Sequence, residues 1–224
     1  MMTTIQKRIP FPNGHGGNRK HDWARKQRRR GVRCRVPHRV RRGVRGRFPV
    51  HVTMRVGEDL ANLRRPAEYR VVRKSIWRGN RKPGFRVNHY SVQSNHLHLL
   101  VEAHGRRELS RGMQGLLIRI AKGLNRLWRR RGSVFADRYF DRILKSRREV
   151  RNALAYVLNN ARKHGIFTRG HDPYSSAERF DGWRERPSPR TALATPWLPR
   201  AHTWLLRIGW RRYGLISATH TPGS

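Results

Sequence analysis

The tripeptide His96-Leu97-His98 is the part of the sequence best suited to chemistry. On a β-strand, side chains alternate between the two faces, so His96 and His98 would project together with their Cα atoms roughly 6 to 7 Å apart. Two imidazoles placed in this way can hold one divalent metal ion. The alternative is that both histidines belong to the solvated face of a half-buried strand.

A second pair of chemically useful residues lies on a later segment, Arg148 to about Lys163, which is predicted to be a helix that stops before Gly165. At ~100° per residue, Tyr156 and Asn160 fall on one flank of the apolar stripe, one turn apart. A tyrosine that fills the core would be expected on the stripe itself, although packing stays an alternative. Asn160 offers an amide oxygen as a third metal ligand, and Tyr156 offers a phenol beside it. The apolar stripe consists of Val150, Ala153, Leu154, Val157 and Ala161.

Several other chemistries of phosphates have no anchor in the sequence. There is no Gly-x-x-x-x-Gly-Lys-Ser/Thr loop and no Gly-x-Gly-x-x-Gly after a strand, which excludes the usual sites for nucleotide hydrolysis and dinucleotide binding. The 13 acidic residues are scattered and form no carboxylate cluster for a nuclease with two metal ions. A histidine-triad nucleotide hydrolase would need a third histidine at the next alternating position, but position 100 is Leu100. The site must therefore combine imidazoles with another group.

The charge of the chain points to a polyanionic partner. Its 52 Lys and Arg residues against 13 Asp and Glu give a formal net charge of +39. Binding to a nucleic-acid backbone should therefore be tight and steeply dependent on salt, and the excess of arginine favours phosphate groups. We expect a soluble cytoplasmic protein that is not associated with a membrane. No stretch approaches the ~20 apolar residues that span a bilayer, and the single cysteine, Cys34, excludes an internal disulfide.

The elements that must position these residues can be read from the periodicity of apolar side chains. We predict strands at residues 50–56, 85–93 and 96–103, the last two joined as a hairpin, and one or two strands within 134–144. Helices are predicted at 59–78, interrupted at Pro66, at 108–130 and at 148–163. This order is typical of an α+β fold with a ferredoxin-like split βαβ antiparallel sheet and one added helix.

The chain divides into three predicted parts. Residues 1–47 form a basic, largely disordered arm, and residues 48–168 form the catalytic domain. Residues 169–224 form an irregular extension rich in proline, tryptophan and arginine, in which 201–213 could be a short amphipathic helix. No function for this extension can be derived from the sequence.

One face of the helix predicted at 108–130 is basic and could follow a nucleic-acid backbone. The alternative is an ordinary solvated face. The residues concerned are Arg119, Lys122, Arg126, Arg129 and Arg130.

From about residue 34 to 165, the chain closely resembles the REP-associated tyrosine transposases, a group of prokaryotic single-tyrosine HUH endonucleases of the IS200-like transposase superfamily. The resemblance rests on the order and spacing of five motifs. These are Pro49-Val-His-Val-Thr-Met-Arg55, Asn95-His-Leu-His-Leu-Leu100, Arg111-Gly-Met-Gln-Gly115, Phe135-Ala-Asp-Arg-Tyr-Phe-Asp-Arg142 and Tyr156-Val-Leu-Asn-Asn160.

The resemblance implies roles for these residues. His96, His98 and Asn160 would bind Mg²⁺ or Mn²⁺, which would polarise the scissile phosphate of single-stranded or hairpin DNA. Tyr156 would be the nucleophile and form a 5′-phosphotyrosine with release of a 3′-OH. The family often has proline after the ligand asparagine, where this chain has Ala161.

Three questions stay open at the level of sequence. Asn159 is an alternative third ligand, and Tyr139 is a rival tyrosine in a segment more typical of a structural strand. The protein could be a transposase or endonuclease acting at hairpins, as a monomer or a homodimer, or a non-catalytic DNA-binding protein of the same fold. An RNA-binding protein ranks last, because no aromatic RNA-binding strand motif is present.

Overall fold

The computed structural model describes residues 43–166, 170–185 and 197–219. Within these ranges four strands form one antiparallel sheet with the spatial order β2-β3-β1-β4. This order confirms the predicted α+β class with a ferredoxin-like sheet. The strands are β1 (Val50–Arg55), β2 (Phe85–Val92), β3 (His96–Ala103) and β4 (Phe140–Ile143).

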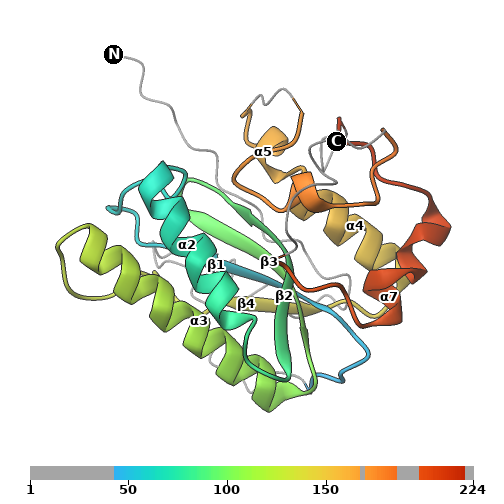
Figure 1. The fold of residues 1–224 in the computed structure, drawn as a ribbon, viewed down its shortest axis with the longest axis horizontal. Helices are drawn as coiled ribbons and strands as arrows, with labels where there is room; N and C mark the ends of the chain where they lie inside the picture. Colours follow the sequence, from blue (N-terminus) through green and yellow to red (C-terminus); the bar gives the residue numbers. More distant parts are fainter. Residues whose placement is uncertain (1–42, 167–169, 186–196, 220–224) are drawn as a thin grey trace, which may run out of the picture. The chain divides into compact units, whose positions relative to one another are not determined.

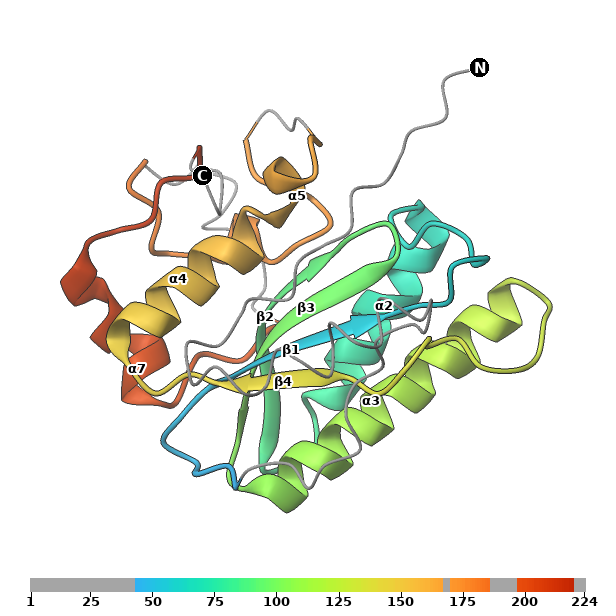
Figure 2. The same ribbon diagram turned by 180° about the vertical axis from the view of Figure 1, so that it is seen from behind.

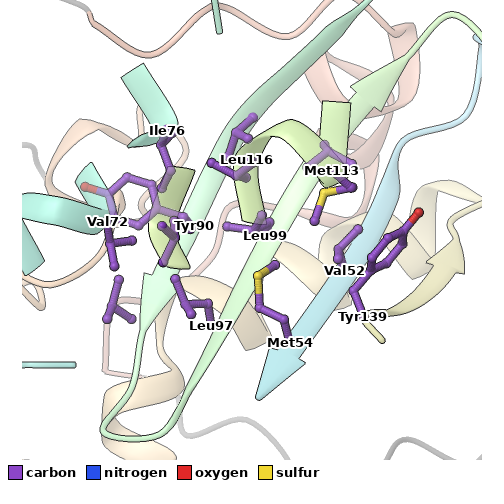
Figure 3. Packing of buried hydrophobic residues seen from close by; sticks show 14 of the residues in the cluster. Val52, Met54, Val72, Ile76, Tyr90, Leu97, Leu99, Met113, Leu116 and Tyr139 are labelled. Atoms are coloured by element: carbon purple, nitrogen blue, oxygen red, sulfur yellow. The ribbon is translucent and has the colours of Figure 1, made fainter. Parts of the chain in front are cut away.

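Strand β3 is buried along its whole length because both faces of the sheet are covered. Leu97 and Leu99 point into one hydrophobic core, where they pack with side chains of α2 and α3 such as Met113 and Leu116 (Figure 3). Leu100 points the opposite way, into a second core. The alternation of β3 therefore places the two histidines on the same side as Leu100.

Two long helices, α2 (Pro66–Gly79) and α3 (Arg106–Leu127), cover the first face (Figure 1). The helix predicted at 59–78 begins only at Pro66, because proline suits the first helical position, whose N–H has no helical partner. Residues 59–65 are turns and irregular chain. The helix predicted at 108–130 is α3, which ends at Leu127.

The second face is covered by α4 (Arg147–Leu158) and by the C-terminal part of the chain (Figure 2). A capping box starts α4: Glu149 N–H donates to the Ser146 hydroxyl, and the Glu149 carboxylate accepts from Ser146 N–H. The C-terminal part contributes η1 (Ala177–Arg179), α7 (Trp204–Arg207) and η2 (Gly209–Tyr213). Buried side chains of the C-terminal part, including Trp183 and Trp210, share one core with α4.

Polar contacts also fix the C-terminal part to the sheet. Arg64 makes a two-pronged ion pair with Asp172, at 2.8 and 2.9 Å. The buried carboxylate of Glu102, at the end of β3, accepts hydrogen bonds from the backbone N–H groups of His202 and Thr203 at 2.7–3.0 Å.

The division of the chain at residues 47 and 168 stays a prediction, and most of the predicted basic arm, residues 1–42, lies outside the described residues.

Two predicted elements are shorter than expected. Within 134–144 only β4 is a strand, and Phe135 adds a single bridge to Val56. The helix predicted at 201–213 is divided into α7 and η2, with a break at Ile208. No helix in the described ranges is both long and apolar enough to cross a membrane.

We predict opposite effects of alanine at two glycines of α3. A Cβ at Gly112 would lie 2.2 Å from Cγ of Phe85, so Gly112→Ala should destabilise the fold by about 1–3 kcal/mol. A Cβ at Gly115 would meet only the flexible end of Arg119 at 3.4 Å, so Gly115→Ala should stabilise it by up to ~1 kcal/mol. Urea unfolding measures both, and a stabilising Gly112→Ala would contradict the packing of α3 on Phe85.

Candidate active site

His96 and His98 lie next to each other on the face of β3 that α4 covers. Their ring centres are 4.9 Å apart, and the side chains are 3% and 2% exposed. The alternation of the strand correctly predicts the shared face. The alternation does not predict that both histidines are buried, because it fits equally well a strand whose histidines face solvent.

The hydrogen bonds of the two rings use one nitrogen of each. Nδ1 of His96 lies 2.9 Å from Asn95 Oδ1, and Nδ1 of His98 lies 3.0 Å from Thr53 Oγ1 and 3.2 Å from His51 Nε2. Both Nε2 atoms are buried and have no hydrogen-bond partner among the described residues. A buried polar atom without a partner costs about 1–3 kcal/mol, so this arrangement leaves both Nε2 atoms available to a ligand.

Burial keeps the pair in the form that a metal ligand needs. It lowers the pKa of His96 to about 3, and the charges of His164 and Arg55 act in the same direction. Burial also lowers the pKa of His98 well below its ordinary value, with a further contribution from His51. Both imidazoles are therefore neutral near pH 7, and each keeps a lone pair.

Tyr156 of α4 lies beside His98 and His51. Its ring centre is 5.1 Å from that of His98, in an edge-on arrangement, and 5.9 Å from that of His51. The ammonium group of Lys163 lies 5.0 Å from the centre of the phenol ring. Burial raises the pKa of Tyr156, and the neighbouring Asn160 amide opposes this shift, although no hydrogen bond of ordinary geometry joins the two side chains.

The two asparagines after Tyr156 differ in what they contact. The prediction of one continuous helix at 148–163 is wrong. The structure has two helices here, because α4 ends at Leu158 and α5 (Asn160–Lys163) begins after a break at Asn159. Asn159 Nδ2 donates to the backbone carbonyl of Ser217 at 2.9 Å, which engages its amide in the fold. Asn160 is fully buried, and neither Oδ1 nor Nδ2 has a partner in the part of the chain that the structure describes.

The donor set fits a divalent cation only if an amide takes part. Among the described residues, no three His, Cys, Asp or Glu side chains are grouped so that they could hold a metal ion. The Nε2 atoms of two neutral imidazoles and one amide oxygen, all buried without a hydrogen-bond partner among the described residues, remain as possible ligands. The amide oxygen suits Mg²⁺ or Mn²⁺, whereas imidazole nitrogen is a commoner ligand of softer metals, so oxygen atoms of water and of a substrate phosphate would have to complete the shell of either ion.

The sequence prediction missed the residues that surround this set. His51 and Thr53 of β1 touch His98, and Asn95 touches His96. His51 and Thr53 alternate with buried valines of β1 and pair opposite Leu100 and His98. The strand pattern could have found them once the pairing of β1 with β3 was known, because residues opposite each other share a face.

Tyr139, the rival tyrosine, is 8% exposed and belongs to the core on the other face of the sheet. It lies near Val52 (Figure 3). Tyr139 therefore belongs to a hydrophobic core, whereas Tyr156 lies against the imidazoles of His51 and His98.

The five basic residues predicted to form one stripe on α3 lie in different surroundings in the structure. Lys122 and Arg126 are exposed on the helix, whereas Arg119 lies against Gly79 of α2. Arg129 and Arg130 follow the end of α3, where the Arg130 guanidinium donates to Asn125 and to the carbonyl of Ser133. The role of these five residues in binding DNA stays a prediction.

The arrangement of the sheet and its helices is similar to that of a solved structure, a REP-associated tyrosine transposase bound to a REP hairpin. The TM-score is 0.53 at 18% sequence identity, and the match covers 64% of this chain and 84% of the transposase chain. This chain has the fold of that transposase. No protein-family model and no curated protein matches the sequence.

We predict that the Tyr156 phenol ionises above its ordinary pKa of 10.0, because burial disfavours the phenolate. Alkaline titration at 295 nm of the wild type and of Tyr156→Phe isolates this phenol as the difference between the two curves. Tyr213→Phe, which removes a phenol from a side chain that is 54% exposed, provides the comparison. A Tyr156 difference curve with its midpoint at or below pH 10.0 would contradict the burial of this side chain.

Proposed function

We propose that the protein is a REP-associated tyrosine transposase, a DNA endonuclease and strand transferase that acts at hairpin-bearing single-stranded DNA. The observation that carries this proposal is a set of buried polar atoms that have no hydrogen-bond partner among the described residues and lie near the phenol of Tyr156, namely His96 Nε2, His98 Nε2 and the Asn160 amide. The similarity to a transposase bound to a REP hairpin supports DNA hairpins as the substrate. We place this activity in the cytoplasm at the nucleoid, in a monomer or a homodimer.

His96 Nε2, His98 Nε2 and Asn160 Oδ1 would hold Mg²⁺ or Mn²⁺ in this proposal. Such an ion supplies positive charge that polarises the non-bridging oxygens of a bound phosphate. Asn95 and Thr53 orient the two imidazoles through their Nδ1 atoms, so that Nε2 of each ring stays available.

Tyr156 performs the covalent step. Its phenolic oxygen attacks phosphorus, the P–O3′ bond breaks, and the DNA is left with a 5′-phosphotyrosine and a 3′-hydroxyl, the phenol proton being passed to solvent and a proton taken up by O3′. The Asn160 amide beside the phenol favours the phenolate and opposes the effect of burial on the pKa of Tyr156. Attack by a 3′-hydroxyl on the phosphotyrosine reverses the step and rejoins the strand, so no nucleoside triphosphate is needed.

We predict that Tyr156→Phe abolishes the covalent adduct between the protein and a hairpin-bearing oligonucleotide in the presence of Mg²⁺, because the attacking oxygen is gone. Its affinity for the same DNA should stay within about twofold. Denaturing gel electrophoresis of labelled DNA measures the adduct, and Tyr213→Phe should form it normally. An adduct that survives Tyr156→Phe would point first to Tyr139, and no adduct from the wild type across many hairpins would favour a non-catalytic DNA-binding protein.

We predict that Asn160→Ala weakens Mn²⁺ binding by at least ~10-fold, comparable to the loss in His96→Ala or His98→Ala, because each change removes one ligand. Asn159→Ala is the matched control and should change Mn²⁺ affinity by less than about twofold, since the Asn159 amide is engaged with Ser217. Electron paramagnetic resonance of free Mn²⁺ measures binding without DNA. A larger loss in Asn159→Ala than in Asn160→Ala would assign the third ligand to Asn159.

A further inference from the structure

The solvent face of α2 carries a basic and aromatic stripe. Arg70, Arg73, Lys74 and Trp77 follow one another at offsets of 0, 3, 4 and 7, which puts them on one side of the helix. All four side chains are exposed, and Trp77 is 42% exposed. Packing against the sheet does not require these residues, because α2 buries its opposite side.

The C-terminal part of the chain turns this stripe into a groove. Arg179 and Trp197 lie across from α2, and the six residues line a cavity of about 540 Å³, here called the α2 groove. The guanidinium groups of Arg73 and Arg179 lie 5.4 and 5.8 Å from the ring centre of Trp197. The described residues that line the α2 groove include no acid.

The chemistry of the α2 groove selects for a ligand with both negative charge and a flat apolar ring. Four cations in a small space repel one another and are stabilised by an anion, for which guanidinium groups favour phosphate. The exposed indole of Trp77, which has the Arg81 guanidinium 5.4 Å from its ring centre, offers a second face on which a base can stack. A nucleotide has both features, but its base is accessible for stacking only in a single strand, because in a duplex the base faces are covered by neighbouring bases.

A line of aromatic and cationic side chains connects the candidate active site with the α2 groove. His164 lies against His96, with ring centres 5.3 Å apart, and the charge of Arg64 acts on His164. The Arg64 guanidinium lies 4.5 Å from the ring centre of Tyr174. Tyr174 packs on Tyr69, with ring centres 4.9 Å apart, and the charge of Arg73 acts on Tyr69. Aromatic rings therefore extend from the candidate active site toward the α2 groove, and the charge of Arg64 between them is balanced by Asp172.

We propose that the α2 groove binds single-stranded DNA, with phosphates on Arg70, Arg73 and Lys74 and a base stacked on Trp77. The choice of DNA rests on the proposed function, since the strand is the one whose phosphate reaches Tyr156. Binding in the α2 groove does not require cleavage.

The test compares variants in their affinity for a fluorescent oligothymidylate, which forms no hairpin, at several salt concentrations. Loss of one stacked base should weaken binding by about 5- to 30-fold in Trp77→Ala, and Trp77→Phe should restore most of it. The double variant Arg73→Gln/Lys74→Gln should weaken binding by at least ~10-fold and reduce the salt slope by about 1 to 1.5. The matched control is Arg107→Gln/Arg212→Gln, which removes the same charge from two exposed sites outside the α2 groove and should cost less than about threefold.

Two outcomes would overturn the proposal. Equal losses in the groove and control variants would mean that the net charge of the whole chain drives binding. An equal loss for Trp77→Ala on oligothymidylate and on a blunt duplex would mean that no base stacks on this side chain. Oligothymidylate binding measured in Tyr156→Phe separates the two proposals, because the α2 groove should work normally there even if the wild type forms no adduct.

Discussion

Strand β3 is buried on both faces, and the rest of the molecule is arranged around that constraint. Its odd-numbered leucines belong to the core under α2 and α3, so its even-numbered positions must face α4. Polar side chains at even positions are then buried as well, and each needs a partner or a ligand. The Glu102 carboxylate accepts hydrogen bonds from the backbone N–H groups of residues 202 and 203. His96 and His98 each keep one ring nitrogen without a hydrogen-bond partner among the described residues. The same sheet that stabilises the fold thus creates the site.

The local pattern of side chains was enough to predict most of the fold. Alternation predicts β1, β2 and β3 to within one residue, and the apolar spacing of 109–127 predicts α3. The break at Asn159 was not predicted, and the hydrogen bond of its side chain to Ser217 has no signal in the local sequence because the two residues are far apart in the chain. The division between α7 and η2 was not predicted either, and both elements pack in the same core as α4. Where the local preference for helix is weak, contacts between distant parts of the chain determine where the helices end.

The candidate site was predicted less completely than the fold. The spacing of His96, His98, Tyr156 and Asn160 was sufficient to group them, because strand and helix periodicities place side chains on known faces. Spacing gave no sign of His51 or Thr53 at the site, since their position depends on the register between β1 and β3. The binding role predicted for the basic residues of α3 is untested, and charge alone did not reveal that Arg130 donates to Asn125 and to the carbonyl of Ser133.

The hydrogen bond from Asn159 to the carbonyl of Ser217 has a consequence for the order of synthesis. A ribosome makes Tyr156 and Asn160 long before residue 217, so the turn between α4 and α5 lacks its anchor while the chain is still growing. The core beneath α4 is incomplete for the same reason, because Trp210 and Ile216 also come late. The grouping of phenol, imidazoles and amide is therefore completed only after residues 210–217 have been synthesised.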